Sequence, residues 1–350
     1  MTDLHTHEDV RTYYGEVLKT KADLQTTACC PTEAIPVHLR SKVALIADEI
    51  QTKFYGCGSP IPDVLEGCTV LDLGCGTGRD VYLASQLVGE QGRVIGIDMT
   101  PQQLEVARKY QDEHRQRFGH ERSNVSFHEG YMEKLDDIGV EDSSVDVAIS
   151  NCVINLAPDK KAVFREILRV LKPGGELYFS DVFSDRRLST DMKQDPVLVG
   201  ECLGGALYVE DFRRMMSDLG IRDYRVIASS PIEPSNPELE ERCGNVRFYS
   251  MTIRVFNLPQ LEDRCEDYGQ VAWYLGTIDN KPHRFGLDDH HIFLTGKPMP
   301  VCSNTASMLA DSRLAPHFRI DGNTDVHFGI FDCGPDAAVQ SSDASPGACC

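Results

Sequence analysis

Three glycines at alternate positions follow an apolar run and form a stretch suited to binding a cofactor. The run Thr69–Leu73 is expected to be a strand, and Gly74, Gly76 and Gly78 separate it from a predicted helix. Glycine is needed in such a loop because a Cβ would block a ligand lying against the N–H groups at a helix N-terminus. Asp98 ends the next apolar run, twenty residues beyond Gly78, where its carboxylate is placed to accept hydrogen bonds from ribose hydroxyls.

The spacing of the glycines distinguishes between kinds of cofactor. A dinucleotide-binding loop reads G-x-G-x-x-G, whereas this loop reads G-x-G-x-G and follows Asp72. A carboxylate at that point is badly placed for a pyrophosphate and well placed for a cation. The stretch Val70–Arg79 resembles motif I of the class I S-adenosylmethionine-dependent methyltransferases, in which the loop holds the amino-acid end of the cofactor. An ordinary strand–turn–helix is the alternative, and the combination of strand, glycines and Asp98 argues against it.

Composition and charge restrict the possible partners. The chain has 350 residues, 41% of them hydrophobic, which is enough for a large and a small domain. Its net charge of −19 disfavours nonspecific attraction to nucleic acid or to anionic membrane. No apolar run approaches the length of a membrane span, and the polar, acidic start is unlike a signal peptide. We therefore expect a cytoplasmic protein with no nucleic-acid or membrane partner.

Strands that alternate with helices predict an α/β fold, a doubly wound Rossmann-like sheet with a small α+β C-terminal domain. The expected units are 1–66, a helical segment with cysteine loops that completes the site; 67–256, the cofactor domain; 257–333, the C-terminal domain; and 334–350, a disordered tail that ends in two cysteines. Apolar spacing predicts several helices, among them Asp9–Leu24, Pro36–Phe54, Asp80–Val88 and Thr100–Arg117. It also predicts an antiparallel pair of strands over Tyr224–Ala228 and Phe248–Phe256.

Thirteen cysteines are many for a protein expected in a reducing compartment. There is no C-x-x-C pair that would indicate a zinc ribbon. Core packing, redox chemistry and binding of a soft ion remain as uses. Six of them are interpreted as small buried hydrophobes, namely Cys68, Cys75, Cys243, Cys265, Cys302 and Cys333.

Three other cysteines point to chemistry. Cys152 follows the fourth predicted strand, on the sheet edge that also carries the glycine loop. Cys57 and Cys202 have glycine neighbours, which argues against burial in the core. Thiolates beside a methyl donor indicate a thiophilic acceptor, and trivalent arsenic fits this requirement. Its lone pair can attack a sulfonium methyl without a general base, so positioning would supply most of the catalysis.

Several segments closely resemble the arsenite S-adenosylmethionine methyltransferases. The resemblance covers roughly residues 9 to 256 well and is looser beyond. Its specific segments are Ser150–Leu156 and Gly200–Ala206, and those that accompany them are Tyr13–Leu18, Ala22–Thr26, Tyr55–Gly58 and Gly175–Asp181.

The resemblance implies roles for individual residues. Cys152 and Cys202 match the family's arsenic-binding cysteines, and Cys57 matches the third thiol. In the family, an upstream cysteine forms a disulfide with this third thiol. Cys29 matches that upstream cysteine, but Cys30 is adjacent and the choice between the two stays open. The implied cofactor is S-adenosylmethionine, with no metal cofactor, and its expected binding residues are Tyr55, Asp72, Gly74, Gly76, Gly78, Arg79, Asp98, Met99, Met132, Glu133 and Asn151.

The implied reaction transfers methyl groups to arsenite or its glutathione conjugate and gives mono- and dimethylated arsenic. Protein thiols, reset by thioredoxin or glutathione, would return arsenic to the trivalent state. One alternative is a class I methyltransferase for a small organic acceptor, which predicts activity in Cys152→Ser. Another is a metalloid-binding protein without turnover, against which the intact glycine loop argues. A nucleic-acid methyltransferase fits the charge least well.

Overall fold

The computed structural model describes residues 35–54, 56, 58–234 and 237–333. The expected helix over Asp9–Leu24, the expected disordered tail 334–350 and the site residues Cys29, Tyr55 and Cys57 lie outside these ranges. None of the helices in the described part of the chain is both long and apolar enough to cross a bilayer.

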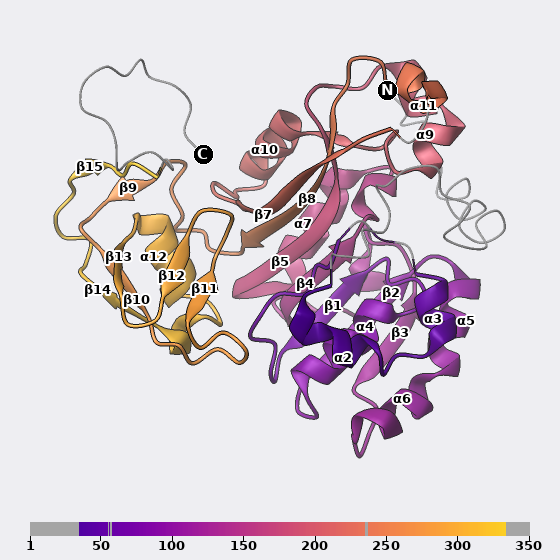
Figure 1. Ribbon diagram of the computed structural model, residues 1–350, viewed down its shortest axis with the longest axis horizontal. Helices are drawn as coiled ribbons and strands as arrows, with labels where there is room; N and C mark the ends of the chain where they lie inside the picture. Colours follow the sequence, from indigo (N-terminus) through magenta and orange to yellow (C-terminus); the bar gives the residue numbers. More distant parts are fainter. Residues whose placement is uncertain (1–34, 55, 57, 235–236, 334–350) are drawn as a thin grey trace.

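An eight-stranded sheet lies at the centre of the protein (Figure 1). Its parallel part orders the strands β3-β2-β1-β4-β5, so the chain winds outward from β1 in one direction and from β4 in the other. The gap between β1 and β4 is therefore the topological switch point, where doubly wound proteins bind ligands. These strands are β1 (Thr69–Leu73), β2 (Arg93–Asp98), β3 (Val125–Glu129), β4 (Val145–Asn151) and β5 (Leu171–Ser184).

An antiparallel pair completes the sheet. β8 (Phe248–Phe256) pairs with β5 and β7 (Arg225–Ile232) pairs with β8, both antiparallel, while the short β6 (Leu207–Tyr208) runs parallel to β5. The predicted α/β doubly wound fold and its antiparallel strand pair are confirmed.

Side chains alternate between two apolar layers, as the pleat of a strand requires. Val70 packs with α4 (Arg79–Val88) and α5 (Pro101–Lys109) on one face, and Leu71 packs with α7 (Lys160–Val170) and α10 (Val209–Asp218) on the other. Because both faces are covered, the central strands are buried almost completely.

Two predicted helices are interrupted by tertiary contacts. The segment expected to be one helix over Pro36–Phe54 divides into short helices, and Ala47 at the break donates its N–H to His114 Nε2 at 3.1 Å. The helix expected to reach Arg117 breaks at Tyr110, whose hydroxyl donates to Glu49 at 2.6 Å. The pieces are η3 (Val37–Leu39), α2 (Arg40–Val43), α3 (Asp48–Thr52), α5 and α6 (Gln111–Phe118).

The chain after β8 forms three small sheets around its own apolar core, which includes Tyr274, Phe285 and Phe293. Its elements are β9 (Glu266–Asp267), β10 (Val271–Tyr274), β11 (Arg284–Gly286), β12 (Ile292–Leu294), β13 (Pro298–Pro300), α12 (Ser303–Ala310), η6 (Ala315–His317), β14 (Phe318–Asp321) and β15 (Gly329–Ile330). The remaining helices lie before β8. They are η4 (Leu135–Ile138), η5 (Ile154–Leu156), α8 (Thr190–Gln194), α9 (Pro196–Gly200) and α11 (Pro237–Cys243).

Buried ion pairs join this C-terminal part to the edge of the large sheet, beside which it lies in Figure 1. The Glu176 carboxylate of β5 is fully buried and accepts from both Arg254 and Arg313. Arg225 of β7 pairs with Asp288 at 3.2 Å. Because breaking a buried pair leaves an uncompensated charge, these contacts fix the two parts against each other.

Candidate active site

A cavity opens at the switch point between β1 and β4, lined by the glycine loop on one side and by Cys152 and Cys202 on another. With its open mouth it encloses about 1030 Å³, which is in the range of clefts that bind small molecules and cofactors. The carboxyl ends of the parallel strands meet here, so residues distant in sequence share one site.

The glycine loop has the geometry that its spacing predicts. Gly74, Gly76 and Gly78 all have positive φ, and Gly78 is the N-cap of α4. A Cβ at Gly74 would lie 2.3 Å from Val153, so β1 and the segment after β4 approach too closely for any other residue. Asp98 fixes the loop to β2 by accepting from the N–H groups of Gly76 and Thr100, both at 2.8 Å.

Three carboxyl groups gather at the floor of the cavity. Burial raises the pKa of Asp72 well above its usual range, and Asp80 and Asp98 raise it further. Burial also raises the pKa of Asp98. Arg79 pairs with Asp80 at 2.7 Å and thereby compensates one of these charges. A cationic ligand would lower these pKa values by favouring the ionised carboxylates, so the site fits a positively charged group.

Cys152 and Cys202 are both buried, and both have a backbone conformation that is rare for their residue type. The prediction that the glycine neighbours of Cys202 would keep it out of the core is wrong, because the residue packs with Val182 and Leu203 in an apolar cluster. The φ angles of the two cysteines are 57° and 62°, in the left-handed region that costs a non-glycine residue about 1–3 kcal/mol. Cys202 donates its thiol to the carbonyl of Cys152 at an Sγ–O distance of 3.9 Å. The Cys152 sulfur is disulfide-bonded in this structure, so it must be reduced before it can bind a soft ion.

Close packing keeps these two cysteine segments together. A Cβ at Gly205, three residues after Cys202, would lie 2.2 Å from the carbonyl oxygen of Asn155. The Asn155 side chain donates to the carbonyl of Val182 at 2.5 Å, and its N–H donates to Asp181. The strained conformations are thus maintained by their surroundings, as expected at functional sites.

Asn151 connects the cavity to the segment before β1. Its amide oxygen accepts from Gly58 N at 3.2 Å, and its amide nitrogen donates to the Gly58 carbonyl and to Asp80, both at 3.0 Å. A Cβ at Gly56 would lie 2.7 Å from the Asn151 side chain. Asn151 therefore positions Gly56 and Gly58 beside Cys152.

The cavity brings together most of the residues predicted for the site. Ten line it, namely Asp72, Gly74, Gly76, Asp98, Met99, Met132, Glu133, Asn151, Cys152 and Cys202. Gly78 and Arg79 do not line the cavity. Gly78 caps α4, and the Arg79 guanidinium lies over the Phe54 ring, 3.2 Å from the ring centroid. Cys29, Tyr55 and Cys57 lie outside the described residues.

Sequence reasoning missed several lining residues, among them Asp80, Phe54, Thr100 and Gln103. A signal existed for Asp80, because an acid two residues beyond Gly78 lies in the first turn of α4 and on the side of the loop. The others carry no chemical pattern in the sequence and are recruited by the fold alone.

Comparison with known proteins places the chain in a class and then in a family. A family model described as a methyltransferase domain matches residues 65–220. An arsenite methyltransferase from Aquipseudomonas alcaligenes is 50% identical over 94% of both chains, and one from Homo sapiens is 44% identical over 91% of this chain and 85% of that protein. The crystal structure of an arsenic(III) S-adenosylmethionine methyltransferase from Chlamydomonas reinhardtii matches with a TM-score of 0.83, at 52% identity over 85% of this chain and all of that one. The chain belongs to the arsenite methyltransferase family, as its motifs predicted.

Proposed function

We propose that this protein transfers methyl groups from S-adenosylmethionine to trivalent arsenic bound by Cys152 and Cys202. The observation that carries the proposal is their placement: two buried cysteines in left-handed backbone conformations line the same cavity as the glycine loop and the acids Asp72 and Asp98. Strain of this kind is retained where the surrounding structure requires a side chain to point in one direction.

The residues of the cavity fit the cofactor. The carboxyl groups of Asp72 and Asp98 match its cationic amino-acid end and its ribose, and Gly74 and Gly76 leave their backbone open to it. Met99, Met132 and Glu133 line the part of the cavity beyond β2 and β3, where the adenine would lie. When bound, S-adenosylmethionine supplies an electrophilic methyl group on a sulfonium.

Arsenic chemistry explains why the site needs thiols and no general base. Trivalent arsenic exchanges its hydroxyl or glutathione ligands for protein thiolates and keeps a lone pair. That lone pair forms the As–C bond, so no proton has to be removed from the nucleophile, and the protein contributes by holding arsenic at attack distance. Cys57 is the proposed third thiol, since the sequence places it between Gly56 and Gly58, which Asn151 holds beside Cys152.

Each methylation leaves arsenic pentavalent, so two electrons must return before the next. Two protein thiols supply them by becoming a disulfide, with Cys29 or Cys30 as the partner of Cys57, and thioredoxin or glutathione restores the thiols by exchange. The proposed products are mono- and dimethylated arsenic, formed in the cytoplasm as a detoxification reaction.

The test is arsenic speciation after incubation of the purified protein with S-adenosylmethionine, arsenite and glutathione. We expect methylated arsenic from the native protein and none from Cys152→Ser or Cys202→Ser. Cys68→Ser is the matched control, because Cys68 is also buried but lies outside the cavity. The native yield of methylated arsenic from Cys152→Ser would overturn the assignment of Cys152 as an arsenic ligand. No methylated arsenic from the native protein, despite intact cofactor binding, would favour an organic acceptor. Arsenite binding without methylated product would favour a metalloid-binding protein.

A further inference from the structure

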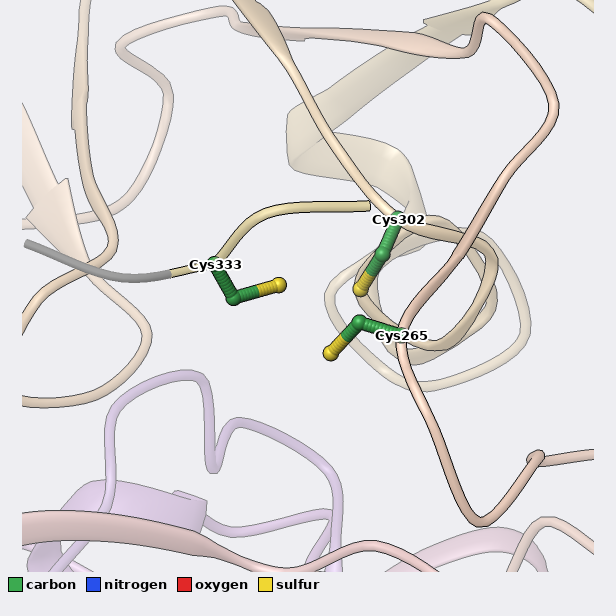
Figure 2. Close-up of side chains that lie close together, drawn as sticks. All are labelled: Cys265, Cys302 and Cys333. Atoms are coloured by element: carbon green, nitrogen blue, oxygen red, sulfur yellow. The ribbon is translucent and has the colours of Figure 1, made fainter. Parts of the chain in front are cut away.

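Three cysteines distant in sequence meet in the C-terminal part. The sulfur atoms of Cys265, Cys302 and Cys333 all lie within 4.8 Å of one another, and Figure 2 shows the side chains converging from separate segments. The sequence interpretation treated them as separate buried hydrophobes, but Cys265 and Cys333 are partly exposed. Isolated packing residues have no reason to converge, so the cluster needs another explanation.

Strand pairing and helix contacts build this cluster. β9, which follows Cys265 directly, pairs with β15, and Phe331 donates its N–H to the Cys265 carbonyl at 2.8 Å. The pairing brings Cys333 next to Cys265. Asn304 lies in the first turn of α12, accepts a hydrogen bond from the N–H of Glu262 and donates one to the Glu262 carbonyl, both at 2.8 Å. These two bonds join the loop before Cys265 to α12, the helix that Cys302 caps.

The position of Cys302 at a helix start also suits it to bind a ligand. Cys302 is the N-cap of α12, and its Sγ accepts from the N–H of Thr305 at 3.4 Å. A helix N-terminus is one of the settings that favour the thiolate form of a cysteine.

The charges around the cluster discriminate between soft ions. Arg225 is already paired with Asp223 at 2.8 Å and with Asp288 at 3.2 Å, so its positive charge is compensated. Three thiolates on Zn²⁺ would add a net negative charge to this partly buried setting, and zinc requires a fourth ligand. Three thiols and arsenous acid instead give a neutral tris-thiolate and three water molecules, with no change in oxidation state.

We propose that Cys265, Cys302 and Cys333 form a second binding site for trivalent arsenic, separate from the methyl-transfer cavity. Its partly exposed cysteines leave a path for arsenite to enter. The bound ion would connect the loop before β9, the start of α12 and the segment after β15, and so would stabilise the C-terminal part against unfolding.

The experiment uses the full chain, reduced, in a Cys152→Ser/Cys202→Ser background that removes the proposed methyl-transfer ligands. Bound arsenic is counted by elemental mass spectrometry after incubation with arsenite and removal of the unbound ion. Adding Cys265→Ser/Cys302→Ser/Cys333→Ser should remove one equivalent of arsenic per chain and the arsenite-dependent rise in unfolding temperature. Adding Cys68→Ser/Cys243→Ser, two other buried cysteines, should remove neither.

Arsenic X-ray absorption identifies the ligands. In the background variant we expect arsenic with sulfur neighbours alone, and in Cys333→Ser, a mild change at a partly exposed position, at least about tenfold weaker binding at this site. An unchanged arsenic count in the triple variant, or a site that retains zinc and does not exchange it for arsenite, would overturn the proposal. Failure of methyl transfer in the native protein would bear on the proposed function alone.

Discussion

The two thiol sites of this molecule are built by opposite means. Cys152 and Cys202 have strained backbones, at φ 57° and 62°, and border a cavity that also contains the glycine loop. The cluster of Cys265, Cys302 and Cys333 is positioned by regular strand pairing and a helix cap. A catalytic site must hold the arsenic in one orientation relative to the bound cofactor. A site that only binds arsenic needs no more than several sulfur ligands that converge on one point. The difference therefore indicates which site performs chemistry and which binds.

The largest effect should come from exchanging sulfur for oxygen at the strained site. We expect Cys202→Ser to lower the rate of arsenic methylation by at least about a thousandfold, or about 4 kcal/mol of transition-state stabilisation, because a hydroxyl is a poor arsenic ligand. The arsenic bound by the Cys265, Cys302 and Cys333 cluster should remain. Product formation by chromatography and arsenic counts on the same sample provide both readouts.

A variant that loses both readouts together would show that the two sites depend on each other and would break the comparison. Cys68→Ser serves as the control here as well and should retain the native rate.

The next effect concerns the charge framework beneath the second site. Arg225→Met removes the cation that pairs with the buried Asp288 and the partly buried Asp223, and we expect a loss of about 3 kcal/mol in the free energy of unfolding. Arg187→Met is the matched control, because the Arg187–Asp211 pair is largely exposed and should contribute less than about 1 kcal/mol. Urea unfolding of both variants measures the difference. Equal losses of unfolding free energy in the two variants would mean that the Arg225 ion pairs stabilise the protein no more than an exposed pair does.

The first site was predictable from the sequence in a way that the second was not. The glycine loop and Cys152 each follow a predicted strand, and Asp98 ends one. Because the carboxyl ends of parallel strands share one edge, their convergence follows from topology. Cys265, Cys302 and Cys333 are brought together by pairing between two-residue strands and by a cap contact. Strands that short leave no periodic pattern, so this cluster was interpreted as packing.

The same reasoning explains the errors at the level of helices. The apolar spacing over Pro36–Phe54 is genuine, since Ile46 and Ile50 are buried. Local spacing contains no information about the hydrogen bond from Ala47 to His114, which replaces a helical bond and divides the segment. Asp80 and Phe54 likewise line the cavity through the fold rather than through a motif.

A smaller effect should distinguish the cofactor loop from an ordinary glycine turn. Gly76 and Gly119 both have positive φ, 52° and 75°, and a Cβ at either meets no protein atom within 4 Å. Gly76→Ala and Gly119→Ala should therefore each cost about 1 kcal/mol of stability. Only Gly76 lines the cavity, so only Gly76→Ala should weaken S-adenosylmethionine binding, by about tenfold in calorimetric titration. Equal affinities in the two variants would contradict the assignment of the loop.

The last comparison is a pH dependence that differs between the two regions. Near Cys152, burial raises the pKa of Asp181 to about 7. Its native state thus holds a proton that the unfolded chain has lost, and stability should fall as pH rises from about 4 to 7, by at most about 1.4 kcal/mol per pH unit. Beneath the second site, hydrogen bonding to His291 lowers the pKa of Asp288 despite burial. Its contribution has the opposite sign and should be lost as pH falls below about 4.

Unfolding free energies of Asp181→Asn and Asp288→Asn between pH 3 and 8 separate the two contributions. Asp181→Asn should flatten the decline between about pH 4 and 7, and Asp288→Asn should remove part of the loss below about pH 4. The two regions then differ in electrostatics as they do in backbone geometry, since burial raises the pKa of the carboxyl in one and the carboxyl in the other pairs with Arg225. If Asp181→Asn kept the native slope, the cavity wall would have to be stabilised by another group.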